Sequence, residues 1–231
     1  MDNNSKLIIR QNREVYNKIA DHFSDTRSFL WRDLEPLSTF VHDRDSILDI
    51  GCGNGRLYQL FTDLSIAFTG IDIAEGLIEI AKEKYPKARF VVGDMVSLPF
   101  EDQEFDVVFS LVAFHHLPDE ESQLKSLAEM GRVLKKGGKI ILLNWNAYSD
   151  WVSEKLKKGD YKELGDHLFE VPWKTQKKEN LGNRIYYGFT LEELEKLFEK
   201  TGLNLEDQYY LRHGEKVGVD KGMNIVSILS K

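Results

Sequence analysis

The sequence predicts an α/β protein built on a doubly wound, mostly parallel β-sheet. Short apolar runs alternate with amphipathic stretches from Ser46 onward, the pattern of strands that alternate with helices. The apolar run 47–50 leads directly into a glycine-rich turn, and the run 105–111 is apolar at successive positions, as in a strand covered on both faces. Strand–helix–strand units of this kind have parallel strands joined by right-handed crossovers.

The apolar periodicity predicts the elements in order along the chain. Val15, Ile19 and Phe23 share one face of a first helix, and a second apolar series over 31–41 is bent or restarted at Pro36. The strands expected in the centre of the chain are 47–50, 67–73, 90–92, 105–111 and 139–144. The helices expected between them are 75–85 and 120–134, the second with its stop signal at Gly137-Gly138.

The last third of the chain divides into two parts. Residues 151–188 hold aromatic residues, glycines and lysines without a clear period, so we expect an insertion over the edge of the sheet. A helix follows at 191–201 and stops at Gly202, and the runs 205–211 and 224–229 are expected to form a closing antiparallel pair of strands.

Composition narrows the class of protein. The chain has 231 residues, enough for one sizeable core, and its net charge of −7 (31 Lys+Arg, 38 Asp+Glu) differs from the basic surplus typical of a stand-alone nucleic-acid binder. Residues 151–188 carry a net charge of +2 and the rest of the chain −9.

Cys52 is the single cysteine, so neither an internal disulfide nor a cysteine metal cluster is expected. With a polar start and no long apolar run, we expect a cytoplasmic protein that does not enter the membrane.

A glycine-rich turn follows the first strand of the predicted sheet. Gly51, Gly53 and Gly55 permit close approach of a ligand to the backbone, at the strand end where open α/β sheets bind ligands. A tight turn without a ligand is the alternative. The third glycine comes one residue too early for the nicotinamide pattern G-x-G-x-x-G. Asp49, just before the turn, can accept hydrogen bonds from the loop amides or from an ammonium group, or cap the turn.

Two further carboxylates follow the next two strands. Asp72 comes 21 residues after Gly51, the spacing at which such folds bind the hydroxyls of a ribose, and its alternative role is to cap the following helix. Asp94 can accept a hydrogen bond from the exocyclic amine of an adenine. Met95 and Ile73 can contact the faces of that base, or simply belong to the core. We therefore predict a nucleoside-bearing cofactor at this edge of the sheet.

The end of the fourth strand is where a cofactor and a second substrate are expected to meet. Ser110, together with Cys52 in the glycine turn, is assigned to the cofactor site. His115 and His116 follow, and because neighbouring residues point in different directions, we expect at most one of them to face the reaction.

These motifs together resemble the class I S-adenosylmethionine-dependent methyltransferases. The resemblance covers about 46–145 and rests on Asp49-x-Gly51-x-Gly53-x-Gly55, Asp72, Gly93-Asp94, Phe105-Asp106-Val107-Val108 and Leu134-Lys135-Lys136-Gly137-Gly138. It implies a seven-stranded sheet with one antiparallel strand, and S-adenosylmethionine as the cofactor. It also implies one domain over 1–231, with a helical lid (1–45), a cofactor-binding core (46–146), a substrate-side insertion (147–188) and a closing helix and strand pair (189–231).

A narrower resemblance extends outside that core, to the tRNA wobble-uridine carboxymethyl methyltransferases. It rests on Tyr16-Asn17-x-Ile19-Ala20-x-His22-Phe23-Ser24-x-Thr26-Arg27, Trp31, Gly76-Leu77-Ile78-Glu79, His115-His116, Val171-Pro172-Trp173 and Arg184-x-Tyr186-Tyr187. It departs from that family at Leu117, where tryptophan is frequent, and at Gly188, where a histidine is common.

This resemblance implies functional roles for particular residues. Arg27 and His116 match the arginine and histidine that lie near the transferred methyl group. The residues expected at the substrate are Tyr16, Trp31, His115, Trp145 and Arg184. The implied acceptor is the carboxylate of a carboxymethyl uridine in tRNA, with no role for DNA or a metal, and the eukaryotic relatives work with a small zinc-binding activator protein. A small-molecule O-, N- or C-methyltransferase and a non-catalytic cofactor-binding protein are the alternatives.

Overall fold

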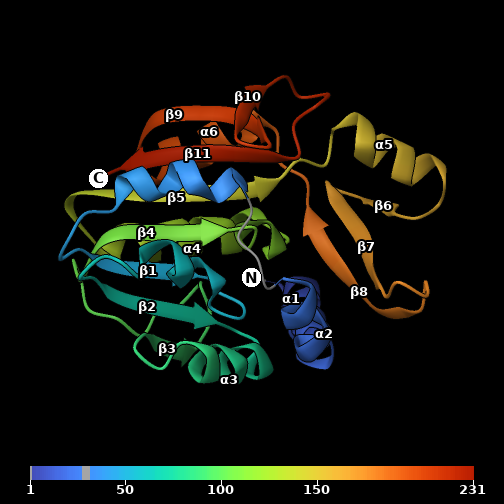
Figure 1. Cartoon of the computed structure of the whole chain (residues 1–231). Helices are drawn as coiled ribbons and strands as arrows, with labels where there is room; N and C mark the ends of the chain where they lie inside the picture. The colour runs from blue at the N-terminus through green and yellow to red at the C-terminus, as the bar shows by residue number, and fades with distance from the viewer. Residues whose placement is uncertain (1, 28–31) are drawn as a thin grey trace.

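The structure, a computed structural model, describes residues 2–27 and 32–231. Within these residues an eight-stranded sheet forms the centre of the molecule (Figure 1). From edge to edge its strands are β3 (Arg89–Val92), β2 (Ala67–Asp72), β1 (Ser46–Ile50), β4 (Phe105–Leu111), β5 (Leu134–Trp145), β11 (Asn224–Ser230), β9 (Asn204–Arg212) and β10 (Glu215–Val217).

The direction of the strands confirms the predicted doubly wound, mostly parallel sheet. Strands β3, β2, β1, β4 and β5 run parallel, whereas β11 is antiparallel to both of its neighbours, β5 and β9. The short β10 pairs antiparallel with β9 and adds an eighth strand that the sequence did not predict. The chain reverses its direction of travel across the sheet between β1 and β4, and ligands bind beyond the strand ends at such a switch point.

Helices cover both faces of this sheet. The helices on one face are α4 (Glu120–Val133) and α6 (Leu191–Thr201), and those on the other are α3 (Glu75–Lys84), η1 (Arg32–Phe40) and η2 (Arg56–Phe61). Val108 of β4 packs into the first layer and Val107 and Phe109 into the second, which confirms that this strand is covered on both sides. No helix in the described part of the chain is long and apolar enough to cross a membrane.

Two predicted helix boundaries are wrong. Helix α4 ends at Val133 and β5 begins at Leu134, so the pair Gly137-Gly138 lies inside a strand. A Cβ on Gly138 would come within 2.6 Å of the carbonyl oxygen of Asp106, so this glycine permits close pairing of β5 with β4. The N-terminal helix is two helices, α1 (Asn3–Lys18) and α2 (Ala20–Thr26), separated at Ile19.

The region expected to be an irregular insertion is regular. It holds α5 (Asp150–Lys157) and a separate antiparallel sheet of β6 (Lys162–Gly165), β7 (Leu168–Lys174) and β8 (Asn180–Tyr187). This small sheet, α1 and α2 all lie beyond the carboxyl ends of β1, β2 and β4 (Figure 1), and α1 packs against β8. A short turn, η3 (Phe114–His116), follows β4 at the same end.

Candidate active site

The glycine turn after β1 forms one wall of a cavity of about 580 Å³. Gly51 and Gly53 have φ angles of +73° and +54°, which L side chains rarely adopt. A Cβ on Gly51 would lie 2.2 Å from the Cβ of Ala113, so the turn also needs glycine to pass the loop after β4. The N–H groups of Gly51 and Cys52 both donate to the carbonyl of Ile71, which holds the turn over β2.

Two carboxylates at this wall fit a nucleoside. The oxygens of Asp72 accept from the N–H groups of Gly53 (2.9 Å) and Ala74 (2.8 Å), so one bond fixes each oxygen and leaves a further lone pair for a ligand hydroxyl. Asp94 accepts from the N–H of Val96 through one oxygen, and Ile73 and Met95 line the cavity beside these two residues. The loop capping and the expected ribose contact of Asp72 are therefore compatible.

Asp49 is the deepest acid of the cavity. It is 3% exposed and lies at the end of β1. Burial raises the pKa of Asp49 to about 7, the carboxylate of Asp72 adds to the rise, and the guanidinium of Arg56 opposes it. A cationic ligand group beside Asp49 would favour its ionised form.

The opposite wall is cationic. The Cζ atoms of Arg27 and Arg184 lie 5.2 Å and 4.8 Å from the ring centroid of Trp173, within cation–π range. Among the described residues, no carboxylate forms an ion pair with either guanidinium. Burial lowers the pKa of Arg27 and the charge of Arg184 lowers it further. Arg184 is buried and Arg27 is half-buried. Two such neighbouring cations without an acidic partner among the described residues form a site suited to an anion.

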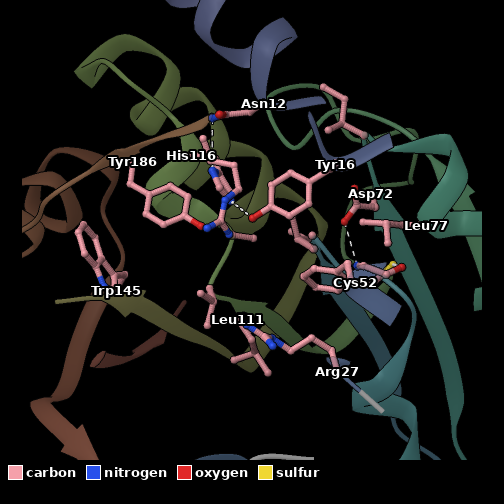
Figure 2. A pocket seen from close by; sticks show the side chains of 18 of the residues that line it. Asn12, Tyr16, Arg27, Cys52, Asp72, Leu77, Leu111, His116, Trp145 and Tyr186 are labelled. Atoms are coloured by element: carbon pink, nitrogen blue, oxygen red, sulfur yellow. Dashed lines mark hydrogen bonds between the residues drawn. The ribbon is translucent and has the colours of Figure 1, made fainter. Parts of the chain in front are cut away.

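His116 links the cationic wall to helix α1. Its Nε2 lies 3.1 Å from the hydroxyl of Tyr16 and its Nδ1 lies 3.3 Å from the amide nitrogen of Asn12. Burial and the charge of Arg184 lower the pKa of His116 to about 3, against a smaller opposing contribution from the backbone of Ile185, so the ring is neutral at pH 7. Figure 2 shows Tyr16 between His116 and the glycine-turn wall that holds Asp72.

Most of the residues predicted from the sequence line this one cavity. They are Tyr16, Arg27, Asp49, Gly51, Cys52, Gly53, Asp72, Ile73, Asp94, Met95, His116, Trp145 and Arg184. Their individual roles stay predictions. Trp31 lies outside the described residues. Groups of three or more potential metal ligands are absent from the described residues.

Two predicted residues do not line the cavity. Ser110 is fully buried inside β4, which continues for one residue, so that Leu111 rather than Ser110 reaches the cavity. His115 is also fully buried, and its Nδ1 accepts the N–H of Trp145 at 3.4 Å behind the cavity wall. Of the two adjacent histidines, His116 is therefore the one that faces the site.

Sequence reasoning did not select several cavity residues, among them the polar side chains Asn12, Arg56 and Tyr161. Asn12 belongs to a mostly polar helix, where a single amide gives no signal. Its importance follows from contacts with residues more than 100 positions away.

Comparison with known proteins identifies the class. A family model described as a methyltransferase domain matches residues 48–142. A tRNA (carboxymethyluridine(34)-5-O)-methyltransferase of Schizosaccharomyces pombe is 29% identical over 217 residues, 86% of this chain and 91% of the relative. The enzyme of that description from Xenopus tropicalis is 33% identical over 144 residues, 62% of this chain but 22% of the relative, so the chain spans about a fifth of that protein.

The fold is also that of solved methyltransferases. A chain of the complex between the Haloferax volcanii Trm112 methyltransferase activator and a methyltransferase superposes with a TM-score of 0.66 at 17% identity, covering 95% of this chain and 96% of that one. The fold and the family model thus define an α/β transferase core. Residues 48–142 form a methyltransferase domain of the S-adenosylmethionine-dependent kind, and the chain is similar in sequence to enzymes named as tRNA (carboxymethyluridine(34)-5-O)-methyltransferases.

The cavity has groups suited to each part of this cofactor. Asp72 would hold the ribose, Asp94 with Met95 and Ile73 the adenine, and Asp49 with the glycine turn the amino-acid end. When bound, the cofactor supplies an electrophilic methyl group on a sulfonium. The chain's own residues would orient the acceptor and exclude water.

Proposed function

We propose that the protein methylates the carboxylate of a carboxymethyl-modified wobble uridine in tRNA. The observation that carries this proposal is the cationic wall, where Arg27 and Arg184 share the faces of Trp173 and lack an acidic partner among the described residues. A carboxylate is ionised at neutral pH, because its ordinary pKa is about 4. It can bind a guanidinium with one oxygen and attack with the other. Such an acceptor requires no general base, which agrees with a neutral His116.

The aromatic lining suits an unstacked base. Trp145, Trp173 and Tyr186 line the cavity, and the guanidinium of Arg184 lies 5.1 Å from the ring of Tyr186. RNA-binding proteins recognise single-stranded bases by stacking them on such rings and on arginine planes. These groups are part of a proposed uridine site, with the carboxymethyl group directed toward Arg27.

A second cavity of about 330 Å³ supports a polynucleotide acceptor. It shares Arg27, Trp173 and Arg184 with the first. Lys155 and Lys174 also line it, together with Asp160, which pairs with both lysines and leaves the group with a net positive charge. Both lysines lie in 151–188, which carries a net charge of +2 against −9 for the rest of the chain. We propose that this cavity takes the backbone of nucleotides next to the uridine, because phosphate contacts supply most of the affinity for RNA.

The experiment is methylation of bulk tRNA with labelled cofactor, followed by mass spectrometry of the nucleosides. The expected product is a methyl ester of carboxymethyl uridine at the wobble position. Arg184→Gln should lower kcat/KM about 10- to 100-fold, the usual worth of a hydrogen bond to a charged group, while exposed Arg212→Gln on β9 should not. Absence of this ester, with transfer to small acids or quinone precursors, would overturn the proposal.

The second candidate function is a small-molecule methyltransferase. The acidic balance, net charge −7, favours it, since the chain as a whole repels phosphate. The two functions differ in ionic-strength dependence. Binding of tRNA should weaken steeply with salt, whereas binding of a small monoanion should change little.

Three further parts of this proposal concern the surroundings of the reaction. Residues 1–45 act as a lid, because Tyr16 and Arg27 reach the cavity from α1 and α2. Limited proteolysis of that segment should slow when cofactor and tRNA are bound. We also propose a cytoplasmic site of action, since Cys52 is a free thiol, and a small zinc-binding activator as partner.

A further inference from the structure

Asn224 is a buried polar residue at the start of a strand that is otherwise made of apolar residues and serines. It begins β11 and is 8% exposed. Among the described residues, no hydrogen bond engages its side-chain amide, and the residue lines the cavity. A polar group so shielded from water is costly to leave unpaired, so an asparagine here indicates contact with a ligand.

The strand register places this amide beside an aromatic pocket. Asn224 is directly opposite Trp145 of β5 in an antiparallel pair, where opposite residues have their side chains on the same face, with Cβ atoms about 5 Å apart. The ring centroids of Tyr161 and Tyr186 lie 6.2 Å and 5.4 Å from that of Trp145, and all three rings line the cavity. Figure 2 shows Trp145 and Tyr186 on the side of the cavity away from Asp72. Rings of this kind stack an unpaired base.

A second buried asparagine at this end of the sheet has a structural role. The amide nitrogen of Asn146 donates to the carbonyls of Val219 and Gly222, both at 2.8 Å, and its oxygen accepts the N–H of Tyr148 at 3.0 Å. Asn146 is fully buried and does not line the cavity. The protein backbone therefore satisfies the amide of Asn146, whereas it leaves that of Asn224 for a molecule in the cavity.

The amide of an asparagine presents one donor and one acceptor side by side. The imide edge of a uracil presents the complement, an N3–H donor next to a ring carbonyl, and asparagine can bind such an edge with two hydrogen bonds at once. The edge formed by N3 and the C2 carbonyl lies away from C5, the atom that carries the carboxymethyl group. One uracil ring can therefore contact Asn224 with this edge while its carboxylate contacts the arginines.

We propose that Asn224 is the base-reading residue of the acceptor site, and that its amide pairs with the imide edge of a uracil stacked against Trp145. The identity of the acceptor rests on the proposed function, whereas the unpaired amide and its place beside Trp145 do not depend on it. Charge and base are then recognised separately. Arg27 and Arg184 bind the carboxylate, and Asn224 selects the ring that carries it.

Two acids that differ in their ring test this assignment. Uracil-5-acetate and phenylacetate have the same carboxymethyl group, but the phenyl ring has no imide edge. Their affinities are compared by titration calorimetry of protein saturated with S-adenosylhomocysteine. Asn224→Ala should weaken binding of uracil-5-acetate about 10- to 100-fold, the usual worth of a bidentate base contact, and leave that of phenylacetate unchanged. Asn204→Ala, at an exposed position of β9, should change neither.

The melting temperature of the cofactor-free protein separates a ligand contact from a structural role. Asn224→Ala removes no hydrogen bond of the folded protein and should change the melting temperature little. Asn146→Ala leaves two carbonyls and one N–H without their partner and should lower it clearly.

The outcomes distinguish this inference from the proposed function. Equal losses for the two acids in Asn224→Ala, or a melting temperature that falls as far as in Asn146→Ala, would overturn the inference even where tRNA receives the methyl ester. A tRNA without methyl ester, together with a preference for uracil-5-acetate that depends on Asn224, would reject the tRNA substrate and keep the base contact. Binding of neither acid to the wild type would reject both.

Discussion

Substitution of Asp49 by asparagine should stabilise the cofactor-free protein while weakening cofactor binding. Its pKa is raised from 3.8 to about 7, so folding favours the protonated form. The unfolded chain loses this proton near pH 4 and the folded protein near pH 7. The contribution of Asp49 to the free energy of unfolding is therefore complete below pH 4. It declines between pH 4 and pH 7 and is lost above pH 7.

The size of the effect follows from that shift. A difference of about three pKa units, at about 1.4 kcal/mol each, corresponds to about 4 kcal/mol lost above pH 7. Asp49→Asn removes the charge and keeps the shape of the side chain. Relief of even a quarter of this cost would raise the melting temperature of a chain of this size by about 2–4 °C.

The cofactor should compensate for this cost. If its ammonium group lies beside Asp49, binding needs the ionised carboxylate, which is half populated near pH 7 and about one-tenth populated at pH 6. The dissociation constant should therefore rise about fivefold from pH 7 to pH 6. In Asp49→Asn, binding should be weaker and nearly independent of pH.

Differential scanning calorimetry without cofactor and titration calorimetry at pH 6, 7 and 8 check both effects. Asp106→Asn is the control, because the pKa of Asp106 is shifted in the opposite direction from that of Asp49. The Lys135 ammonium and the Ser46 donors outweigh burial and lower the pKa of Asp106. This control should lose stability and keep cofactor affinity. A cofactor-free Asp49→Asn protein that melts below the wild type would refute the reasoning.

The remaining predictions concern the glycine turn and the second cavity. Gly51→Ala should abolish measurable cofactor binding and destabilise the fold by more than Gly159→Ala, because both sites have φ near +70° but a Cβ at Gly159 meets nothing within 4 Å. Thermal unfolding and cofactor titration compare the two, and equal effects would rule out the close contact as the cause. Lys174→Ala should lower tRNA affinity and reduce its salt slope by about one, whereas Lys158→Ala, outside that cavity, should not. Unchanged salt slopes in filter-binding titrations would remove the second cavity from the RNA path.

The sheet was predictable because its strands are apolar on both faces. Residues 105–111 and 191–201 were placed at the observed bounds, since burial leaves a continuous or a helical apolar pattern at these positions. The small sheet β6–β8 was not predictable as a sheet. Strand β7 alternates buried with partly buried residues, but β6 is exposed throughout and β8 is buried over 184–186 alone. Val171 and Trp173 are buried by residues distant in the sequence, such as Trp145 and Phe23.

In the site, residues that belong to a sequence motif could be predicted, whereas residues that act through tertiary contacts could not. Asp72 could be predicted from its spacing to the glycine turn, because the fold fixes that distance. Ser110 could not be separated from Leu111, since a shift of one residue in a strand end reverses the side a residue faces. The contacts of Asn12 could not be predicted, because they depend on the β8 backbone, and the sequence gives no reason to place β8 beside α1.

The charge distribution of the cavity bears on turnover as well as on binding. Acids line one wall (Asp49, Asp72) and cations the other (Arg27, Arg184), so the site suits an anionic acceptor facing a cationic cofactor. Burial lowers the pKa of Arg27 and the charge of Arg184 lowers it further, so the charged form of Arg27 is disfavoured before an acceptor binds. A carboxylate compensates this cost on binding. In the proposed reaction esterification removes that negative charge, so the product loses the interaction that held the substrate. The arginines therefore bind the acid more tightly than its ester and assist release of the product.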